Sequence, residues 1–164
     1  NNGVIYPGLA QRMSAGRGIL HSEKNDSWRL TGTPEHCDPV HFIQMWVLPD
    51  TPGINPGYQQ LDINDQLDST GLAVVASGLA EHSHTTAIHI AQSRAGLLAG
   101  RLAPGERQGL PTAPRLHLFV AVGAVELESG ERLEAGDSAR MSESGGIAVT
   151  AGSAGAEILV WQMH

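Results

Sequence analysis

A histidine and a carboxylate two positions apart, His21 and Glu23, are the residues of this chain whose types and spacing best fit chemistry. If they lie on a strand, both side chains point to the same face, because side chains alternate along a strand with period two. Imidazole plus carboxylate suits a non-haem iron, and other first-row divalent metals are compatible with it. Such ions are typically held by roughly three or four protein ligands. The pair therefore predicts part of a metal site, with iron as the metal expected first.

The other histidines have plainer interpretations. His41 falls in an apolar segment, residues 40–48, where a half-buried strand histidine is a simpler explanation than a pocket ligand. His82 and His84 form a His-x-His pair, but no cysteine or carboxylate cluster follows, so we expect a solvated loop rather than a zinc site. His117 falls in an expected core strand and is interpreted as structural. None of these histidines is expected to complete the ligand set.

Composition limits the classes of protein that the chain can belong to. It has 164 residues, of which 41% are hydrophobic and 16% charged, as in an ordinary globular protein. A net charge of -7 with scattered basic residues argues against direct nucleic-acid binding. No apolar run approaches the roughly 20 residues that span a bilayer, and no signal peptide is visible. The single cysteine, Cys37, excludes an internal disulfide and fits a reducing compartment, so we expect a cytoplasmic protein with no membrane partner.

The elements that must position these residues are mostly strands. The 20 glycines and nine prolines suit many short strands joined by turns. The alternation Val125-Glu126-Leu127-Glu128 is typical of a strand with one buried and one exposed face. We expect residues 28–38 to be a loop, because they are polar and contain Gly32 and Pro34. The expected strands are residues 9–13, 18–22, 40–48, 72–76, 86–92, 95–101, 116–122, 124–128 and 157–163.

Four uncommon strings occur in order along the first 60 residues. They are Tyr6-Pro7-Gly8, QRMSAGRGILHSE at 11–23, PVHFIQMWV at 39–47 and GINPGYQ at 53–59. Together they make the chain resemble the pirin family. The resemblance implies a two-domain, all-β cupin protein built from two tandem small β-barrels of the double-stranded β-helix type. It also implies that His21 and Glu23 are metal ligands, joined in the family by an earlier His-x-His motif in the first barrel.

The resemblance also predicts the domain organisation. We expect residues 1–50 to be the C-terminal remnant of the first barrel, 51–69 the inter-domain connection, and 70–164 a complete second barrel without metal. In that second barrel the turn at 135–137 is followed by Met141, Ser142 and Glu143, with no histidine where a metal-binding cupin often has one. The chain starts at Asn1, after the place of the earlier His-x-His motif, so we expect a truncated first barrel. His21 and Glu23 would then be either a vestigial pair that hydrogen-bonds locally or ligands of an ion completed from elsewhere.

Two functional hypotheses from different classes follow. The first expectation is a non-catalytic binding or assembly module that forms a homodimer through its incomplete first barrel. An apolar edge strand at residues 40–48 would lack a partner, and such edges pair with other chains, most often about a twofold axis. Two His21–Glu23 pairs could meet in that dimer and rebuild a four-ligand site with half an ion per chain.

The alternative is a metal-dependent dioxygenase of the quercetin 2,3-dioxygenase type, an activity that the resemblance implies for some pirins. The substrate would be a flavonol-like small molecule bound to the divalent ion, and Glu23 would accept the proton of its hydroxyl group. This alternative requires that another chain or segment complete the metal site. Because His21 and Glu23 alone do not meet this requirement, we expect the chain to be inactive rather than active as a dioxygenase.

Overall fold

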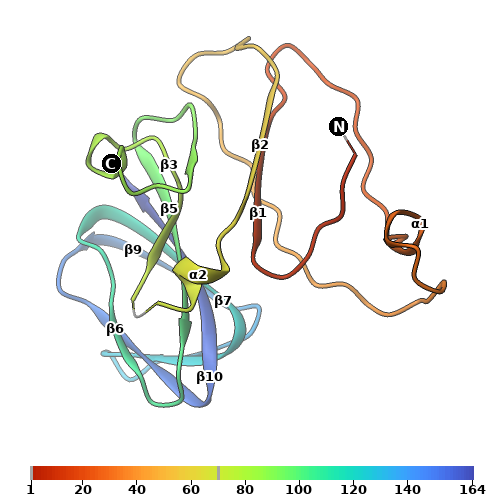
Figure 1. Cartoon of the computed structure of the whole chain (residues 1–164). Helices are drawn as coiled ribbons and strands as arrows, with labels where there is room; N and C mark the ends of the chain where they lie inside the picture. Colours follow the sequence, from red (N-terminus) through yellow and green to blue (C-terminus); the bar gives the residue numbers. More distant parts are fainter. Residues whose placement is uncertain (1, 70) are drawn as a thin grey trace.

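The computed structural model describes residues 2–69 and 71–164. Figure 1 shows a barrel formed by the C-terminal part of the chain, with an open part formed by the N-terminal residues beside it. The open part contains the strands β1 (Leu9–Ser14) and β2 (Gly57–Asp62) and the short helices α1 (Trp28–Thr31) and α2 (Asn64–Leu67). β1 and β2 form an antiparallel two-stranded sheet, and the chain between them makes wide loops that reach away from the barrel.

The barrel is one eight-stranded sheet. Its strands follow the order β4-β3-β5-β10-β7-β8, with β6 paired to β10 and β9 to β7. The β3–β4 pair is parallel and the other pairs are antiparallel. The elements are β3 (Ala73–Ser77), the 3-10 helix η1 (Ala80–His82), β4 (Ile88–His89), β5 (Ala95–Leu102), β6 (Arg107–Gly109), β7 (Ala113–Leu127), β8 (Arg132–Glu134), β9 (Ser138–Ser144) and β10 (Ala148–Met163).

The barrel interior is filled by branched aliphatic side chains from its longest strands. Leu116, Leu118, Val120, Ile158 and Val160 are each at most 1% exposed. Burying a side chain of this kind stabilises a fold by about 1.5–3 kcal/mol. The residues alternate in and out along β7 and β10, as expected for strands that line a core. The all-β prediction is thus confirmed, with a well-filled barrel core.

A second apolar cluster joins the open part to the outside of the barrel. On β5, Leu98 points into the barrel core, whereas Leu97 and Ala99 point to the opposite face. That outer face is covered by Ile63 and Leu67 from the segment around α2. Because both faces of β5 are covered, its residues are buried almost without interruption, and the sequence there is nearly continuously apolar.

β7 corrects the prediction of two separate strands at residues 116–122 and 124–128. It is one strand in which Ile158 of β10 pairs with Val120 and the next residue, Glu157, pairs with Val122. The skipped residue is a β-bulge, which inserts one residue and reverses the alternation. Val120 is therefore fully buried, whereas Val122 is 49% exposed. Beyond the bulge, Val125 is buried and Glu126 exposed, as predicted.

The open part departs further from the predicted strands. Within the described chain, residues 18–22 and 40–48 form no strand, and a helix, α1, begins inside the predicted loop 28–38. β2 lies in the predicted connection 51–69 and pairs with β1 in register from Leu9–Asp62 to Ser14–Gly57. Residues 40–48 have the composition of a strand, but strand formation also requires a neighbouring backbone to pair with. The division into domains at residues 50 and 70 stays a prediction.

Candidate metal site

His21 lies just beyond the turn that ends β1. In this turn the amide of Gly18 donates to the carbonyl of Ala15 at 2.9 Å. Gly16 has φ 55°, and an added Cβ would lie 2.1 Å from the carbonyl oxygen of Ile54, so the turn needs glycine there. Arg17 Nη2 donates to Asn55 Oδ1 at 2.8 Å and ties the turn to the segment before β2. The turn thus directs the chain with His21 away from the two-stranded sheet.

Glu23 contacts a residue that is distant from it in the sequence. Its Oε1 accepts a 3.5 Å hydrogen bond from Gln44 Nε2, and nearby Asn25 Nδ2 donates to the carbonyl of Asp38 at 2.9 Å. These two bonds hold the segment after His21 beside residues 38–44. The side chains of His21 and Glu23 are both exposed. The Gln44 contact was missed because nothing local in a sequence marks two residues 21 positions apart as neighbours.

The donors present do not by themselves fit a transition-metal ion. Within residues 2–69 and 71–164, no three side chains of His, Cys, Asp or Glu gather in an arrangement that could hold a metal. His41, in the same open part, is exposed and belongs to no such group. His21 and Glu23 can therefore offer two donors where such an ion typically takes roughly three or four. Their role as ligands stays a prediction that requires donors from elsewhere.

The histidine at position 82 corrects the expectation of a solvated loop. It ends η1, and its side chain is only 13% exposed, with Nδ1 3.0 Å from Ser77 Oγ. His84 is exposed, as expected. No role was predicted for His36. It packs edge-on against Trp28 with ring centroids 5.2 Å apart, and its Nδ1 lies 3.2 Å from Asp38 Oδ2.

Asp62, a carboxyl group of the open part whose pKa is shifted, ends β2 just before α2. Asp62 Oδ1 accepts hydrogen bonds from the backbone amide of Asn64 at 2.9 Å and from its Nδ2 at 3.0 Å. The backbone bond is the main reason that the pKa of Asp62 is lowered. The pKa of Tyr6 is raised, first by desolvation and then by its bond to Asp62. These shifts belong to a structural junction some distance along the chain from His21.

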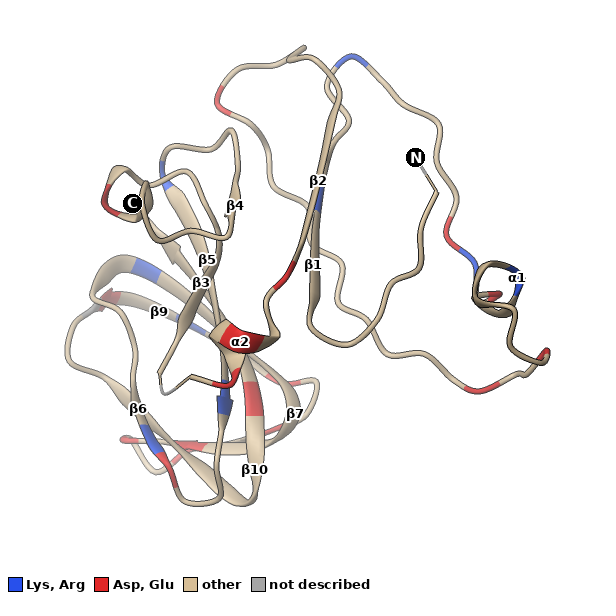
Figure 2. Ribbon diagram, viewed as in Figure 1, with Lys and Arg blue, Asp and Glu red and all other residues tan. Residues whose placement is uncertain are grey.

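Charge is distributed over the whole surface. Figure 2 shows Lys and Arg in both the open part and the barrel, interspersed with Asp and Glu. Several are paired, as Arg101 is with Asp68 at 2.9 Å and Arg132 with Glu134 at 2.7 Å. The described helices are all too short or too polar to cross a membrane.

Two family models match the chain in succession. The pirin model matches residues 1–47, and the model of the quercetinase C-terminal cupin domain matches residues 74–163. The protein named "Putative quercetin 2,3-dioxygenase Rv0181c" from Mycobacterium tuberculosis is 49% identical over 164 residues, which is 100% of this chain and 63% of that protein. A relative of the same description from Zymomonas mobilis is 28% identical over 153 residues, covering 92% of this chain and 60% of its own. The chain thus spans less than two thirds of the length of these relatives.

Solved structures agree with the fold. YhhW from Escherichia coli superimposes with a TM-score of 0.61 at 21% identity, over 73% of this chain and 48% of YhhW. A second structure, of the bacterial pirin YhhW in complex with nickel(II), gives 0.60 at 21% identity, over 72% of this chain and 48% of that one. At this identity the likeness concerns the fold alone. With both family models and the mycobacterial relatives in agreement, the chain belongs to the pirin family and has its all-β cupin fold.

Proposed function

We propose that this chain is part of a metal-dependent dioxygenase of the quercetin 2,3-dioxygenase type. His21 and Glu23 would provide two ligands to a divalent transition metal, with iron as the first candidate, and a second copy or another polypeptide segment would provide the rest. The observation that carries the proposal is the 49% identity, over the whole chain, to mycobacterial relatives that bear this name. The nickel(II) complex of YhhW, a pirin of the same fold, supports a divalent metal.

The surroundings of Glu23 are compatible with this role. Its side chain is exposed, and its hydrogen bond to Gln44 is long, at 3.5 Å, and involves only Oε1. One carboxylate oxygen is thus available to a metal or to the proton of a flavonol hydroxyl group. His21 is exposed as well, so both donors can be reached by a second polypeptide without unfolding the barrel.

Metal content of the purified protein, measured by elemental analysis after loading with Fe²⁺ or Ni²⁺ and dialysis, tests the proposal. We expect bound metal in an assembly of two or more polypeptides, and its loss in His21→Ala and in Glu23→Ala. His84→Ala removes an exposed histidine of the barrel and should keep the metal. Oxygen-dependent consumption of quercetin should follow the same pattern. If neither monomers nor assemblies retain metal, the proposal is wrong.

A binding or assembly role is the second candidate, and one observation favours it. The large hydrophobic residues that are exposed lie, apart from Val122, within residues 5–61. Trp46 is 92% exposed and Leu48 84% exposed, and both lie in the extended segment that was predicted as a strand. Exposed apolar surface concentrated in one region is typical of a surface that another polypeptide covers. We propose a second copy of the chain as the occupant, in a homodimer about a twofold axis.

Sedimentation of the wild type and of two variants tests the assembly role. Trp46→Ser should weaken the dimer, because it removes a large apolar side chain from the proposed contact. Val122→Ser removes the exposed apolar side chain of the barrel and should leave the dimer unchanged. A wild-type chain that stays monomeric at concentrations of about 100 μM, where an interface with a micromolar Kd would be saturated, would contradict this role.

A further inference from the structure

Two polar side chains of the described chain are buried, and each is hydrogen-bonded to a residue of η1. Ser77, at the end of β3, is 1% exposed, and Gln162, near the end of β10, is 4% exposed. Ser77 Oγ lies 3.0 Å from His82 Nδ1, and Gln162 Nε2 donates to Glu81 Oε1 at 2.7 Å. His82 Nε2 lies 3.7 Å from the same Glu81 oxygen. These four residues, here called the polar latch, fasten η1 to the barrel from two strands.

The hydrogen-bond directions within the latch are consistent with one tautomer of His82. Ser77 Oγ accepts the backbone amide of Leu79 at 3.0 Å, and its proton can go to His82 Nδ1 at 3.0 Å, which is the shorter of its two remaining contacts. His82 then carries its proton on Nε2, which faces Glu81. Gln162 also lies 3.2 Å from His164 Nε2, which places a second imidazole at the edge of the latch. Each buried polar group therefore has a partner, and removing one would leave another unsatisfied.

The neighbouring strand makes room for the latch. A Cβ at Gly96 of β5 would lie 2.8 Å from Ser77 Oγ and 3.0 Å from His82 Nδ1. Any side chain there would displace one of the two. The absence of a side chain at Gly96 leaves the space in which their bond forms, although the backbone of Gly96 does not itself require glycine. The Ser77–His82 bond of the polar latch therefore requires that residue 96 be glycine.

The latch is bonded to the loop that follows β4. The carbonyl of Ala95 accepts the amide of Gly78 at 3.1 Å, and Ser77 Oγ lies 3.5 Å from the same oxygen. The amide of Ala95 in turn donates to the carbonyl of Gln92 at 3.4 Å. A Cβ at Gly78 would lie 2.2 Å from that same Gln92 oxygen, so the two loops are in close contact. The position of residues 90–95 thus depends on the turn that the latch holds.

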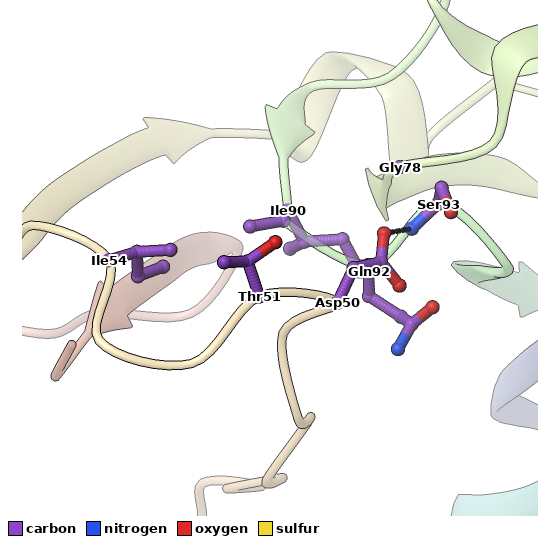
Figure 3. A pocket seen from close by; sticks show the side chains of 8 residues that line it. Asp50, Thr51, Ile54, Gly78, Ile90, Gln92 and Ser93 are labelled. Carbon is purple, nitrogen blue, oxygen red and sulfur yellow. Dashed lines mark hydrogen bonds between the residues drawn. The ribbon is translucent and has the colours of Figure 1, made fainter.

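The same loop is where the open part docks on the barrel. Asp50 Oδ2 accepts the amide of Ser93 at 2.7 Å, and the amide of Asp50 donates to the carbonyl of Ala91 at 2.8 Å. Gln92 Nε2 donates to the carbonyl of Leu48 at 2.9 Å. Figure 3 shows Asp50 bonded to Ser93. Both residues and Gly78 line a hollow of about 240 Å³. One wall of the joint is therefore the turn that the latch fastens.

We propose that the polar latch controls how residues 48–50 of the open part are held by the barrel, with His82 as the positioning residue. With the latch formed, residues 90–95 present the Ala91 carbonyl and the Ser93 amide to Asp50 in the geometry that binds it. With the latch broken, the loop loses that geometry and the segment is released. This coupling does not depend on the metal-site proposal, since none of its residues is a proposed ligand.

Hydrogen exchange of backbone amides tests the coupling. We expect His82→Ala to accelerate exchange at the amides of residues 50 and 93 by about tenfold, the equivalent of one lost hydrogen bond. Core amides of β7 and β10 should change by less than about twofold. Glu81→Ala, at a side chain that is 55% exposed, should act in the same direction with less risk to folding than His82→Ala, whose side chain is 13% exposed. His84→Ala, in the same turn region but exposed, should have no effect.

A double-mutant cycle separates coupling from a purely structural role. In an Asp50→Ala background the joint is already weakened, so His82→Ala should no longer change exchange at the amide of residue 50. Additive effects of the two substitutions at that amide would overturn the proposal. Equal acceleration at the joint and in the barrel core would also overturn it, because that pattern reports loss of global stability rather than release of one segment.

Discussion

The indole nitrogen of Trp161 lies 3.1 Å from the sulfur of Met45, across 116 positions of sequence. The contact joins β10 of the barrel to the extended segment that carries the exposed Trp46 and Leu48. Arg12 Nη1 makes a second connection at 3.0 Å to the carbonyl of His89. With the bonds of Asp50, these contacts attach an otherwise open N-terminal part to a well-packed barrel.

Replacing Met45 by Leu should weaken this attachment slightly. The substitution keeps the apolar volume but removes the sulfur that accepts the indole N–H, an interaction worth about 0.3–1.5 kcal/mol. In a protein whose other tryptophans, Trp28 and Trp46, are replaced by Phe, the emission of Trp161 should shift to longer wavelength as its ring gains water. Met13→Leu is the matched control, since Met13 and Met45 are both 39% exposed. An unchanged Trp161 spectrum in the Met45 variant would show that the contact is absent in solution.

The bulge in β7 predicts opposite outcomes for two valines two positions apart. Val120→Ala removes two methyl groups from the fully buried side of the strand and should cost about 2 kcal/mol of unfolding free energy. Val122→Ala, on the exposed side, should cost less than about 0.5 kcal/mol. Urea denaturation of both variants measures the difference. Equal losses would mean that the register shift between Ile158 and Glu157 is wrong.

Gly123 should be intolerant of a side chain. Its φ of 73° disfavours other residues, and an added Cβ would lie 2.1 Å from the carbonyl oxygen of Gly155 on β10. Gly123→Ala should therefore destabilise the barrel by several kcal/mol, on the order of 3 or more, as overpacking against backbone adds to the strain. Gly130 has φ 85° with open space around it, so Gly130→Ala should cost only the strain of about 1 kcal/mol. Thermal unfolding of the pair distinguishes the two costs.

The junction at Asp62 predicts a pH dependence of stability. Its folded pKa is lowered by the amide of Asn64, so the stabilisation is present above the unfolded pKa and is lost as pH falls through the folded pKa. Wild-type unfolding free energy should thus decline below a pH of about 4 more steeply than that of Asp62→Asn. Asp65→Asn, three residues later, removes the same charge without these bonds and should keep the wild-type slope. Identical slopes for wild type and Asp62→Asn would contradict the shift.

Local pattern predicted some of the strands that line the barrel core, although residues 148–156 of β10, which also contribute to the core, were missed. The expected strand 95–101 matches β5 within one residue, and 72–76 is displaced by one residue from β3. These segments carry their signal in consecutive residues, since apolar and β-branched side chains alternate or run together wherever a strand is covered. The short strands β6 and β8 and the strand β9 were missed, because they are polar and exist through pairing with β10 and β7.

Tertiary structure decided the elements whose signal is not local. Residues 40–48 have the composition of a strand and remain unpaired, because strand formation needs a backbone beside it as well as suitable side chains. His82 looked like a loop residue until Ser77 and Gly96, brought from β3 and β5, enclosed it. The sequence identified His21 and Glu23 as possible metal donors, but it did not predict which residues lie beside them in the fold. Burial and hydrogen bonding between residues distant in the chain depend on how the fold packs, so local sequence patterns do not predict them directly.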